Sequence, residues 1–245
     1  MKKIKTLSRI IINSLKNFIF CSKIDFFYSV KVLNKLIYSE YLLSKNFDLN
    51  KVILKTNYFE KKYKLEEANW FTHNFQIWDY LLKNKTFHEY LEIGSYEGRS
   101  VVYISEKFRD IHLNIVDPFE NHDQHQKIDW KKIYNNFTYN ISRLENKVTV
   151  NKINSDKFFN NNTKIFDLIY IDGSHFANDT MRDFENSFKN LSINGILICD
   201  DFLFNDFEDV NLNPIAGLIP MLKKYANKIE ILYINHQLFL KKIAE

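Results

Sequence analysis

The stretch EYLEIGSYEGRS, residues 89–100, decides the fold of this chain. A short, mainly apolar run leads into Gly94, and Gly98 follows four positions later, although the 245 residues include only five glycines. Glycine adopts left-handed backbone conformations and lets other groups approach the backbone closely. The stretch therefore predicts a buried strand over 90–93 that turns tightly into a helix over 97–108.

The rest of the chain after residue 86 continues this alternation of strands and helices. Further strands are predicted at 113–116, 148–153, 167–172, 195–200, 229–234 and 238–243, and further helices at about 127–144 and at 177–191. Such alternation predicts a parallel sheet with helices on both faces. Only NHQ separates the last two strands, which permits an antiparallel hairpin and no parallel crossover. We expect an α/β, Rossmann-like, doubly wound, mostly parallel seven-stranded sheet with one antiparallel strand.

Composition and charge bound the classes of protein that the chain can belong to. Apolar residues make up 45% and aromatic residues 16%, which supports a sizeable core and excludes disorder. Cys21 and Cys199 are far apart and form no metal or redox spacing, so a reducing, cytoplasmic setting is expected. Residues 1–64 carry 14 Lys or Arg and 4 Asp or Glu, whereas residues 65–245 carry 20 and 26. We predict a basic, helical N-terminal extension at 1–69 and a catalytic domain at 70–245.

The first 27 residues combine apolar and basic side chains. Arg9 and Lys16 interrupt the apolar run and no small-residue cleavage site follows, which excludes a signal peptide. The run is also too short to span a membrane. Apolar residues recur at three- and four-residue steps and predict one apolar helix face: Ile4, Leu7, Ile11, Leu15 and Phe18. This face would lie on an anionic membrane surface or pack on its own domain or a second subunit, and we favour packing.

The glycine turn is placed where open α/β sheets bind ligands, at the carboxyl end of a strand. Tyr96 stands at the position where the dinucleotide-binding fingerprint has its second glycine. Its bulky side chain would crowd a pyrophosphate, which argues against a dinucleotide-binding turn. Asp117 follows the second strand, 25 residues after Glu92, where an acidic side chain can accept both hydroxyls of a ribose. Ser155 and Asp156 follow the third strand, where an adenine edge would lie.

Four segments, YLEIGSYEGRS, VDPFE, FDLIYIDGSH and GILICDDF, are similar to the successive motifs of class I S-adenosylmethionine-dependent methyltransferases. The group with E-x-G-x-x-x-G-x-S, D-G-S-H and D-D motifs, related to the metal-dependent catechol-type O-methyltransferases, is the most similar. The resemblance runs from about Trp70 to Ile243. It implies S-adenosylmethionine as the cofactor. It also implies the residues that would bind it: Glu92, Gly94, Tyr96, Gly98, Ser100, Asp117, Ser155, Asp156 and Asp172.

Three carboxylates, Asp172, Asp200 and Asp201, end two strands that we expect to be neighbours. Neighbouring strands lie about 5 Å apart, so these groups can converge. Carboxylates packed so closely repel one another, and a hard divalent cation such as Mg²⁺ relieves the repulsion. The metal-dependent enzymes that the chain resembles have such a trio, with Asn in place of the last Asp. The alternative is that Asp172 caps a helix and Asp201 is solvated.

His175 lies three residues after Asp172. The catechol-type enzymes have a lysine base at the equivalent place, so the resemblance implies that His175 removes the hydroxyl proton. A purely structural histidine at a helix start is the alternative. His122 and His125 are expected in a mobile loop, 118–130, over the active site.

The sequence thus predicts a methyltransferase that transfers the methyl group of S-adenosylmethionine to a hydroxyl of a small molecule or glycan, with Mg²⁺ assistance. An NAD-dependent oxidoreductase and a non-catalytic membrane-associated scaffold with this fold are the alternatives. Nucleic acid is not an expected partner, because no recognition motif accompanies the basic N-terminal region. Peripheral membrane contact through residues 1–27 and homo-oligomerisation both remain open.

Overall fold

The structure is a computed structural model, and it describes residues 2–66, 68–120 and 128–245, with side chains described from residue 6 onward. It forms two compact units. Unit 1 comprises Met1–Phe47 with Lys164–Glu245, and unit 2 comprises Asp48–Thr163. His122 and His125, for which a loop over the active site was predicted, lie outside the described residues.

Seven strands form one sheet in the order β3-β2-β1-β4-β5-β7-β6. Their bounds are β1 Glu89–Ile93, β2 His112–Val116, β3 Val148–Asn151, β4 Phe166–Ile171, β5 Leu191–Cys199, β6 Ile229–Ile234 and β7 Leu238–Lys242. β7 runs antiparallel to both of its neighbours, β5 and β6, whereas β1 with β2, β2 with β3 and β4 with β5 pair in parallel. The predicted mostly parallel sheet with one antiparallel strand near its edge is therefore confirmed.

In unit 2, α5 (Arg99–Lys107) connects β1 to β2, and α6 (Trp130–Ile141) connects β2 to β3. The helices α3 (Leu49–Lys62) and α4 (Phe75–Leu81) precede β1, and α7 (Ser155–Asn161) follows β3. β2 is buried along its whole length, as expected for a parallel strand with both faces covered. Trp78 on α4 is fully buried, and its ring contacts those of Phe71 and Tyr103. The Tyr103 hydroxyl donates to Asp79 Oδ1 at 2.7 Å, which ties α5 to α4.

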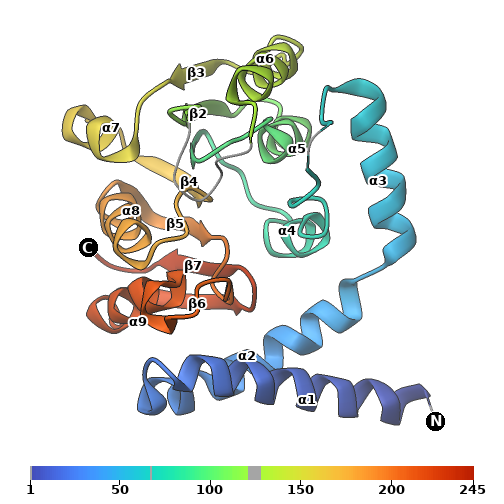
Figure 1. Cartoon of the computed structure of the whole chain (residues 1–245), viewed down its shortest axis with the longest axis vertical. Helices are drawn as coiled ribbons and strands as arrows, with labels where there is room; N and C mark the ends of the chain where they lie inside the picture. The colour runs from blue at the N-terminus through green and yellow to red at the C-terminus, as the bar shows by residue number, and fades with distance from the viewer. Residues whose placement is uncertain (1, 67, 121–127) are drawn as a thin grey trace. The chain divides into compact units, whose positions relative to one another are not determined.

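In unit 1, the sheet is covered by α8 (Ala177–Lys189) and α9 (Pro214–Lys224), which pack together (Figure 1). The rings of Phe188 and Tyr225 lie 4.2 Å apart at this contact. β5 begins at Leu191, four residues before the predicted start. Its pairing with β4 shifts register between Phe166 and Leu168, and Asn194 has a φ of 67°. The irregular start explains why the apolar pattern did not reveal it.

Two helices precede these elements in unit 1, α1 (Lys2–Ser22) and α2 (Phe26–Asn46), and they lie side by side (Figure 1). Asp25 begins α2 by accepting a bond from the backbone N–H of Tyr28 at 2.8 Å. The Ser39 hydroxyl oxygen accepts the backbone N–H of Ile234 at 2.9 Å, which fixes α2 to β6. Among the helices of the described residues, none has the length and apolar character needed to cross a bilayer.

Candidate functional site

The glycine turn of unit 2 uses three residues with positive φ. Gly94, Tyr96 and Gly98 have φ values of 78°, 52° and 81°. A side chain costs free energy in this left-handed region, and glycine avoids that cost. A Cβ added to Gly98 would also lie 3.1 Å from Cδ2 of Phe137. Both predicted glycines are thus required by the backbone, and the turn places the start of α5 beside the end of β1.

Asp117 holds this turn in place. Its Oδ2 accepts the backbone N–H groups of Ser95 at 2.7 Å and Tyr96 at 3.1 Å. Its Oδ1 accepts the backbone N–H of Phe119 at 2.7 Å. The side chain is buried, so these bonds offset the desolvation of the carboxylate. The predicted contact of Asp117 with a ribose stays a prediction, and the structure adds a role in positioning the turn.

Glu92 and Ser100 lie together beneath the turn. The Ser100 hydroxyl donates to Glu92 Oε1 at 2.7 Å, and the Tyr90 hydroxyl donates to Glu92 Oε2. The Glu92 side chain has no exposed surface, and burial raises its pKa to about 7, against the lowering effect of the Tyr90 and Ser100 hydrogen bonds. Near neutral pH this carboxyl therefore exchanges a proton inside the fold.

Several groups at the turn fit a polar, zwitterionic cofactor. The Ser95 hydroxyl is buried beside the Glu92 carboxyl, where it acts with the Tyr90 and Ser100 hydroxyls to lower the pKa of Glu92. This hydroxyl is weakly engaged within the protein and could also serve a ligand. The Tyr96 ring lies 5.1 Å from that of Trp70 and 6.1 Å from that of Trp130. Together they place an aromatic surface next to the turn.

The predicted adenine residues, Ser155 and Asp156, occupy the first turn of α7. Asn154 caps this helix by accepting the backbone N–H of Lys157 at 2.9 Å. Asp117 follows β2 at the same edge, because its backbone N–H donates to the carbonyl of Asn151 at the end of β3, at 3.2 Å. The carboxyl ends of β2 and β3 thus lie side by side, as the prediction requires.

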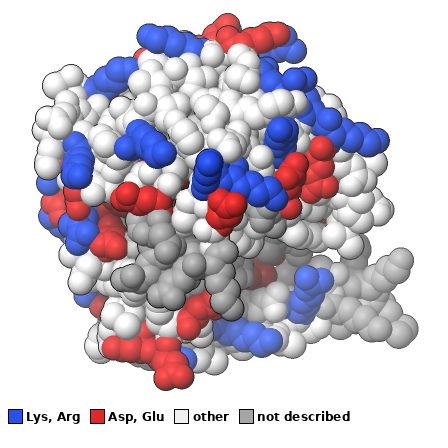
Figure 2. All heavy atoms as spheres, turned by 45° about the horizontal axis from the view of Figure 1, so that its top comes forward, with Lys and Arg blue, Asp and Glu red and all other residues white. Residues whose placement is uncertain are grey.

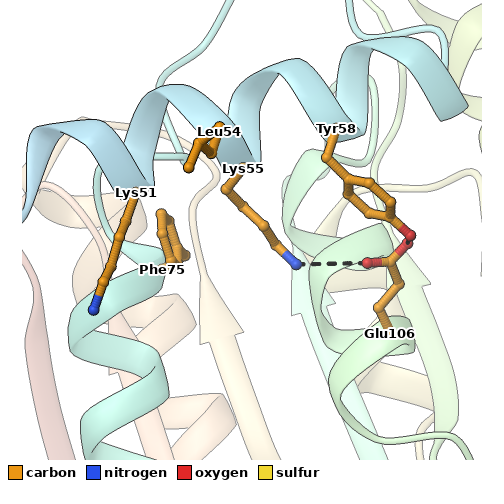
Figure 3. Close-up of a pocket in the computed structure, with 6 residues that line it drawn as sticks. All are labelled: Lys51, Leu54, Lys55, Tyr58, Phe75 and Glu106. Carbon is orange, nitrogen blue, oxygen red and sulfur yellow. Dashed lines mark hydrogen bonds and ion pairs between the residues drawn. The ribbon is translucent and has the colours of Figure 1, made fainter.

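A pocket of about 490 Å³ in unit 2 lies between α3, α4 and α5 (Figure 3). It is lined by Lys51, Leu54, Lys55, Tyr58, Phe75 and Glu106. Glu106 is already engaged, because Lys55 lies 3.6 Å from its Oε2 and the Tyr58 hydroxyl donates to its Oε1 at 3.0 Å. No predicted site residue lines this pocket, and we assign it no ligand.

Unit 1 carries the acidic cluster. The carboxylates of Asp172 and Asp201 and the imidazole of His175 place one ligand atom each within 4.8 Å of the others. Asp172 follows β4 and Asp201 follows β5, so the carboxyl ends of paired strands bring them together. His175 Nε2 lies 2.8 Å from Asp201 Oδ2. The predicted convergence is present for Asp172 and Asp201, and His175 joins them.

Asp200 is held differently from the other two aspartates. Its Oδ2 accepts bonds from the Tyr170 hydroxyl and, at 2.9 Å, from Gln237 Nε2. The Tyr170 hydroxyl also lies 2.9 Å from Asp172 Oδ2. One hydroxyl has one proton to donate, so two carboxylates share it. The loss of solvent around Asp200 and the negative charge of Asp201 raise the pKa of Asp200 above its usual range. The cluster thus has a deficit of positive charge that a proton or a cation would meet.

The protonation of His175 is set by opposing effects. Burial acts to lower the pKa of His175. The hydrogen bond to Asp201 and the negative charges of Asp201, Asp200 and Asp206 act to raise it, and together they outweigh burial. The ring also packs against Phe204, with centroids 4.6 Å apart. His175 is therefore oriented from two sides and carries its proton over a wider pH range than an ordinary histidine.

Three contributors were not predicted from the sequence: Ser95, Tyr170 and Gln237. Ser95 lies inside the quoted glycine stretch but carries no pattern beyond its neighbours. Tyr170 looks like one more apolar strand residue, although strand alternation gives it the same face as Asp172, two positions on. Gln237 belongs to the short connection before β7, where only the pairing of β7 with β5 reveals its proximity to Asp200.

Basic and acidic side chains are interspersed on the face drawn in Figure 2. Among the described side chains of that face there is no broad patch of one sign. Nucleic-acid binding uses a continuous basic stripe. This face offers none.

Comparisons with known proteins agree with these observations. Residues 91–202 match a family described as a methyltransferase domain. A search of curated proteins found no match. The O-methyltransferase TomG from Streptomyces achromogenes, involved in tomaymycin synthesis and solved with S-adenosylmethionine, has a TM-score of 0.54 at 12% identity, covering 84% of this chain and 96% of that chain.

Two further solved structures are similar in fold. The MycE methyltransferase of the mycinamycin biosynthetic pathway, solved with Mg and S-adenosylhomocysteine, has a TM-score of 0.51 at 16% identity, covering 81% of this chain and 54% of that chain. A Clostridium thermocellum protein inferred to be an rRNA-methylase has a TM-score of 0.54 at 13% identity, covering 74% and 99%.

At these identities the structural likeness establishes the fold, while the family match includes the glycine turn, Asp117, Asp172 and Asp200. The family match favours a methyltransferase over the NAD-dependent oxidoreductase. The predicted resemblance to the class I methyltransferases is borne out over residues 91–202, which are similar to a methyltransferase domain.

Proposed function

We propose that the chain transfers the methyl group of S-adenosylmethionine to a hydroxyl of a small molecule or glycan, with Mg²⁺ assistance. The observation that carries this proposal is the convergence of Asp172, His175 and Asp201 at the carboxyl ends of β4 and β5. Two carboxylates and a nearby base suit an acceptor that must lose a proton as it attacks a methyl group. The TomG and MycE structures, solved with S-adenosylmethionine and with Mg and S-adenosylhomocysteine, support the same choice.

In unit 2 the cofactor would bind over the glycine turn. The Ser95 hydroxyl and the N-terminus of α5 would receive its amino-acid end, since helix N-termini favour carboxylates. Asp117 would accept the ribose hydroxyls, and Ser155 and Asp156 would lie near the adenine. Tyr96 contributes an aromatic face, and such faces attract cations such as a sulfonium.

In unit 1 the residues present fit a divalent cation. Asp172, Asp200 and Asp201 offer the carboxylate oxygens that Mg²⁺ prefers, and Asp172 and Asp201 already lie within reach of a common point. When bound, Mg²⁺ would stabilise negative charge on the acceptor oxygen. Tyr170 and Gln237 orient Asp200 by donating to its Oδ2.

His175 would accept the hydroxyl proton. To act as a base it must first be neutral, and its pairing with Asp201 raises its pKa. Turnover that depends on His175 should therefore rise with pH through that raised pKa. The packing of Phe204 on the ring keeps the imidazole oriented while its charge changes.

Calorimetry and a methyl-transfer assay test the proposal together. We expect S-adenosylmethionine and S-adenosylhomocysteine to bind, and NAD not to bind. Radiolabelled S-adenosylmethionine would then be offered with a panel of catechols, phenols and sugars. EDTA should stop transfer and leave cofactor affinity nearly unchanged, and Mg²⁺ should restore transfer.

Each failure points to a different part of the proposal. Full activity in EDTA would refute the Mg²⁺ assignment and leave His175 and positioning to explain catalysis. If a metal that prefers nitrogen ligands restored methyl transfer and Mg²⁺ did not, His175 would be a metal ligand in place of a base. Absence of cofactor binding would favour the non-catalytic scaffold.

A further inference from the structure

We propose that α1 and the start of α2 dock on an anionic membrane surface through an apolar face that the fold leaves uncovered. The docking face consists of Leu7, Ile11, Leu15, Ile19, Phe26 and Phe27. This inference concerns a surface of unit 1 and does not depend on the proposed methyl transfer.

The attachment of α1 to the rest of unit 1 uses another side of the helix. Its buried side chains, among those described, are Ile10, Ser14 and Cys21. Asn13 and Asn17 each donate a side-chain bond to Glu40 of α2, at 3.3 Å and 3.0 Å. Glu40 in turn accepts from Asn235 at 2.7 Å. A largely polar edge therefore fixes α1 in place, although apolar residues are the usual packing face of such a helix.

Four apolar side chains on another face of α1 point to solvent instead. Leu7, Ile11, Leu15 and Ile19 recur at every fourth position, so they share one face of the helix. Leu7 is 60% exposed and Ile19 is 57% exposed. Of the face predicted from the sequence, Leu7, Ile11 and Leu15 are exposed and Phe18 is half-buried, whereas the side chain of Ile4 lies outside the described residues. The three exposed residues do not pack on their own unit.

The apolar face continues into the start of α2. The ring of Phe18 contacts that of Phe26 at 6.1 Å, and Phe26 contacts Phe27 at 5.8 Å. Phe27 is 85% exposed. The exposed apolar side chains of α1 and the two phenylalanine rings of α2 form one contiguous patch. Surfaces of soluble proteins usually expose apolar residues singly, so a patch of this kind marks an interaction site.

The charges around this face are positive. Exposed basic side chains near it are Arg9, Lys16, Lys23 and Lys31, named here the basic rim. In the described part of the chain, none of the four forms an ion pair. The acidic side chains of residues 6–47 are Asp25, which pairs with Lys223 at 2.6 Å, and the buried Glu40. Both negative charges are therefore used internally, and the rim keeps its positive charge.

This charge selects the partner. A second copy of the chain would bring two basic rims together, and like charges at an interface oppose association. An anionic lipid surface attracts the same lysines and receives the apolar residues between the headgroups. A helix with an apolar face and a basic flank, too polar to cross a bilayer, is typical of such interfacial binding.

Vesicle co-sedimentation of the full-length protein tests the proposal. We expect binding to vesicles of phosphatidylcholine with phosphatidylserine at low salt, and at least about tenfold weaker binding to pure phosphatidylcholine. Raising the salt from about 0.05 M to about 0.5 M should weaken binding to the anionic vesicles, because the Debye length shortens.

Matched variants separate the docking face from general stickiness. Leu15→Glu should lower the partition coefficient at least about tenfold, since it places a negative charge inside the face. Ile193→Glu, at a site with the same 49% exposure, is its control and should bind as the wild type does. Lys16→Glu with Lys23→Glu should also abolish binding, whereas Lys147→Glu should not. Thermal unfolding should be nearly unchanged in all of these variants, because the substituted side chains are exposed.

Three results would overturn the proposal. The first is no sedimentation with anionic vesicles at low salt. The second is an equal loss of binding in Leu15→Glu and Ile193→Glu. The third is a dimer in sedimentation velocity that Leu15→Glu dissociates, without vesicle binding, which would assign the face to a second copy of the chain.

Discussion

Glu92→Gln tests how the buried carboxyl beneath the glycine turn contributes to stability. The wild-type side chain has no exposed surface and receives hydrogen bonds from the Tyr90 and Ser100 hydroxyls. Glutamine keeps the shape and an acceptor for Ser100, and its amide can donate to Tyr90, but it cannot ionise. The substitution therefore removes the titration and little else.

The magnitude follows from the raised pKa. Desolvation by burial is the main cause and moves the pKa from 4.5 to about 7. Between these values the folded state binds more protons than the unfolded state, so stability falls as the pH rises. The contribution of Glu92 is fully present below pH 4.5 and lost above about pH 7. At about 1.4 kcal/mol per pH unit, the loss amounts to about 3 kcal/mol.

Urea unfolding at pH 4.5, 5.5, 6.5 and 8 would measure this loss in the wild type and the variant. We expect Glu92→Gln to become more stable relative to the wild type as the pH rises, by about 3 kcal/mol over the range. Subtracting one protein from the other removes the titration of groups that do not interact with Glu92. Glu230→Gln, an exposed site on β6, is the control and should run parallel to the wild type. Parallel curves for Glu92→Gln would refute the burial argument.

Two further substitutions probe the turn. Asp117→Asn should lower the free energy of unfolding by about 1–3 kcal/mol, because an amide nitrogen cannot accept the Ser95 and Tyr96 N–H groups as Oδ2 does. The same substitution should weaken the binding of S-adenosylmethionine, measured by calorimetry. The exposed Asp110→Asn is its control, and an unchanged affinity would remove Asp117 from the cofactor site. Gly98→Ala should lower the unfolding free energy by about 1–2 kcal/mol, since φ is 81° and the new Cβ would press on Phe137, and a neutral result would contradict the strain.

The strands could be predicted because their signal is local. β4 is apolar at five of its six positions, and β1 and β2 each carry three apolar residues out of five, as expected of largely covered parallel strands. The helix α9 carried no such signal, because Pro214, Gly217 and Pro220 all oppose a helix by propensity. Pro214 occupies the first turn, where its missing N–H does no harm, and packing on α8 stabilises the rest. Packing of this kind is not visible in a single segment.

The candidate site was predictable where it depends on strand ends. Asp172, Asp200 and Asp201 were placed correctly at the ends of β4 and β5, because parallel strands bring such residues to one edge. The partners of these residues were not. Tyr170 shares its proton between two carboxylates, and Gln237 reaches Asp200 from the connection before β7. These contacts depend on side-chain direction and on the antiparallel pairing, which the sequence pattern does not specify.

The helical pattern of α1 predicted an apolar face correctly but not the side by which the helix is attached. Its attachment through Asn13 and Asn17 to the buried Glu40 also determines how the docking face must be tested. Removing residues 1–27 would delete these donors and the Asp25 cap of α2, and of the hydrogen bonds to Glu40 described above would leave the one from Asn235. A buried carboxylate stripped of partners destabilises the fold by several kcal/mol, up to about 5. A truncated chain that lost vesicle binding would therefore confound docking with unfolding. Leu15→Glu leaves every one of these bonds intact, so a loss of binding in that variant, with unfolding unchanged, comes from a change at the docking face and not from loss of the fold.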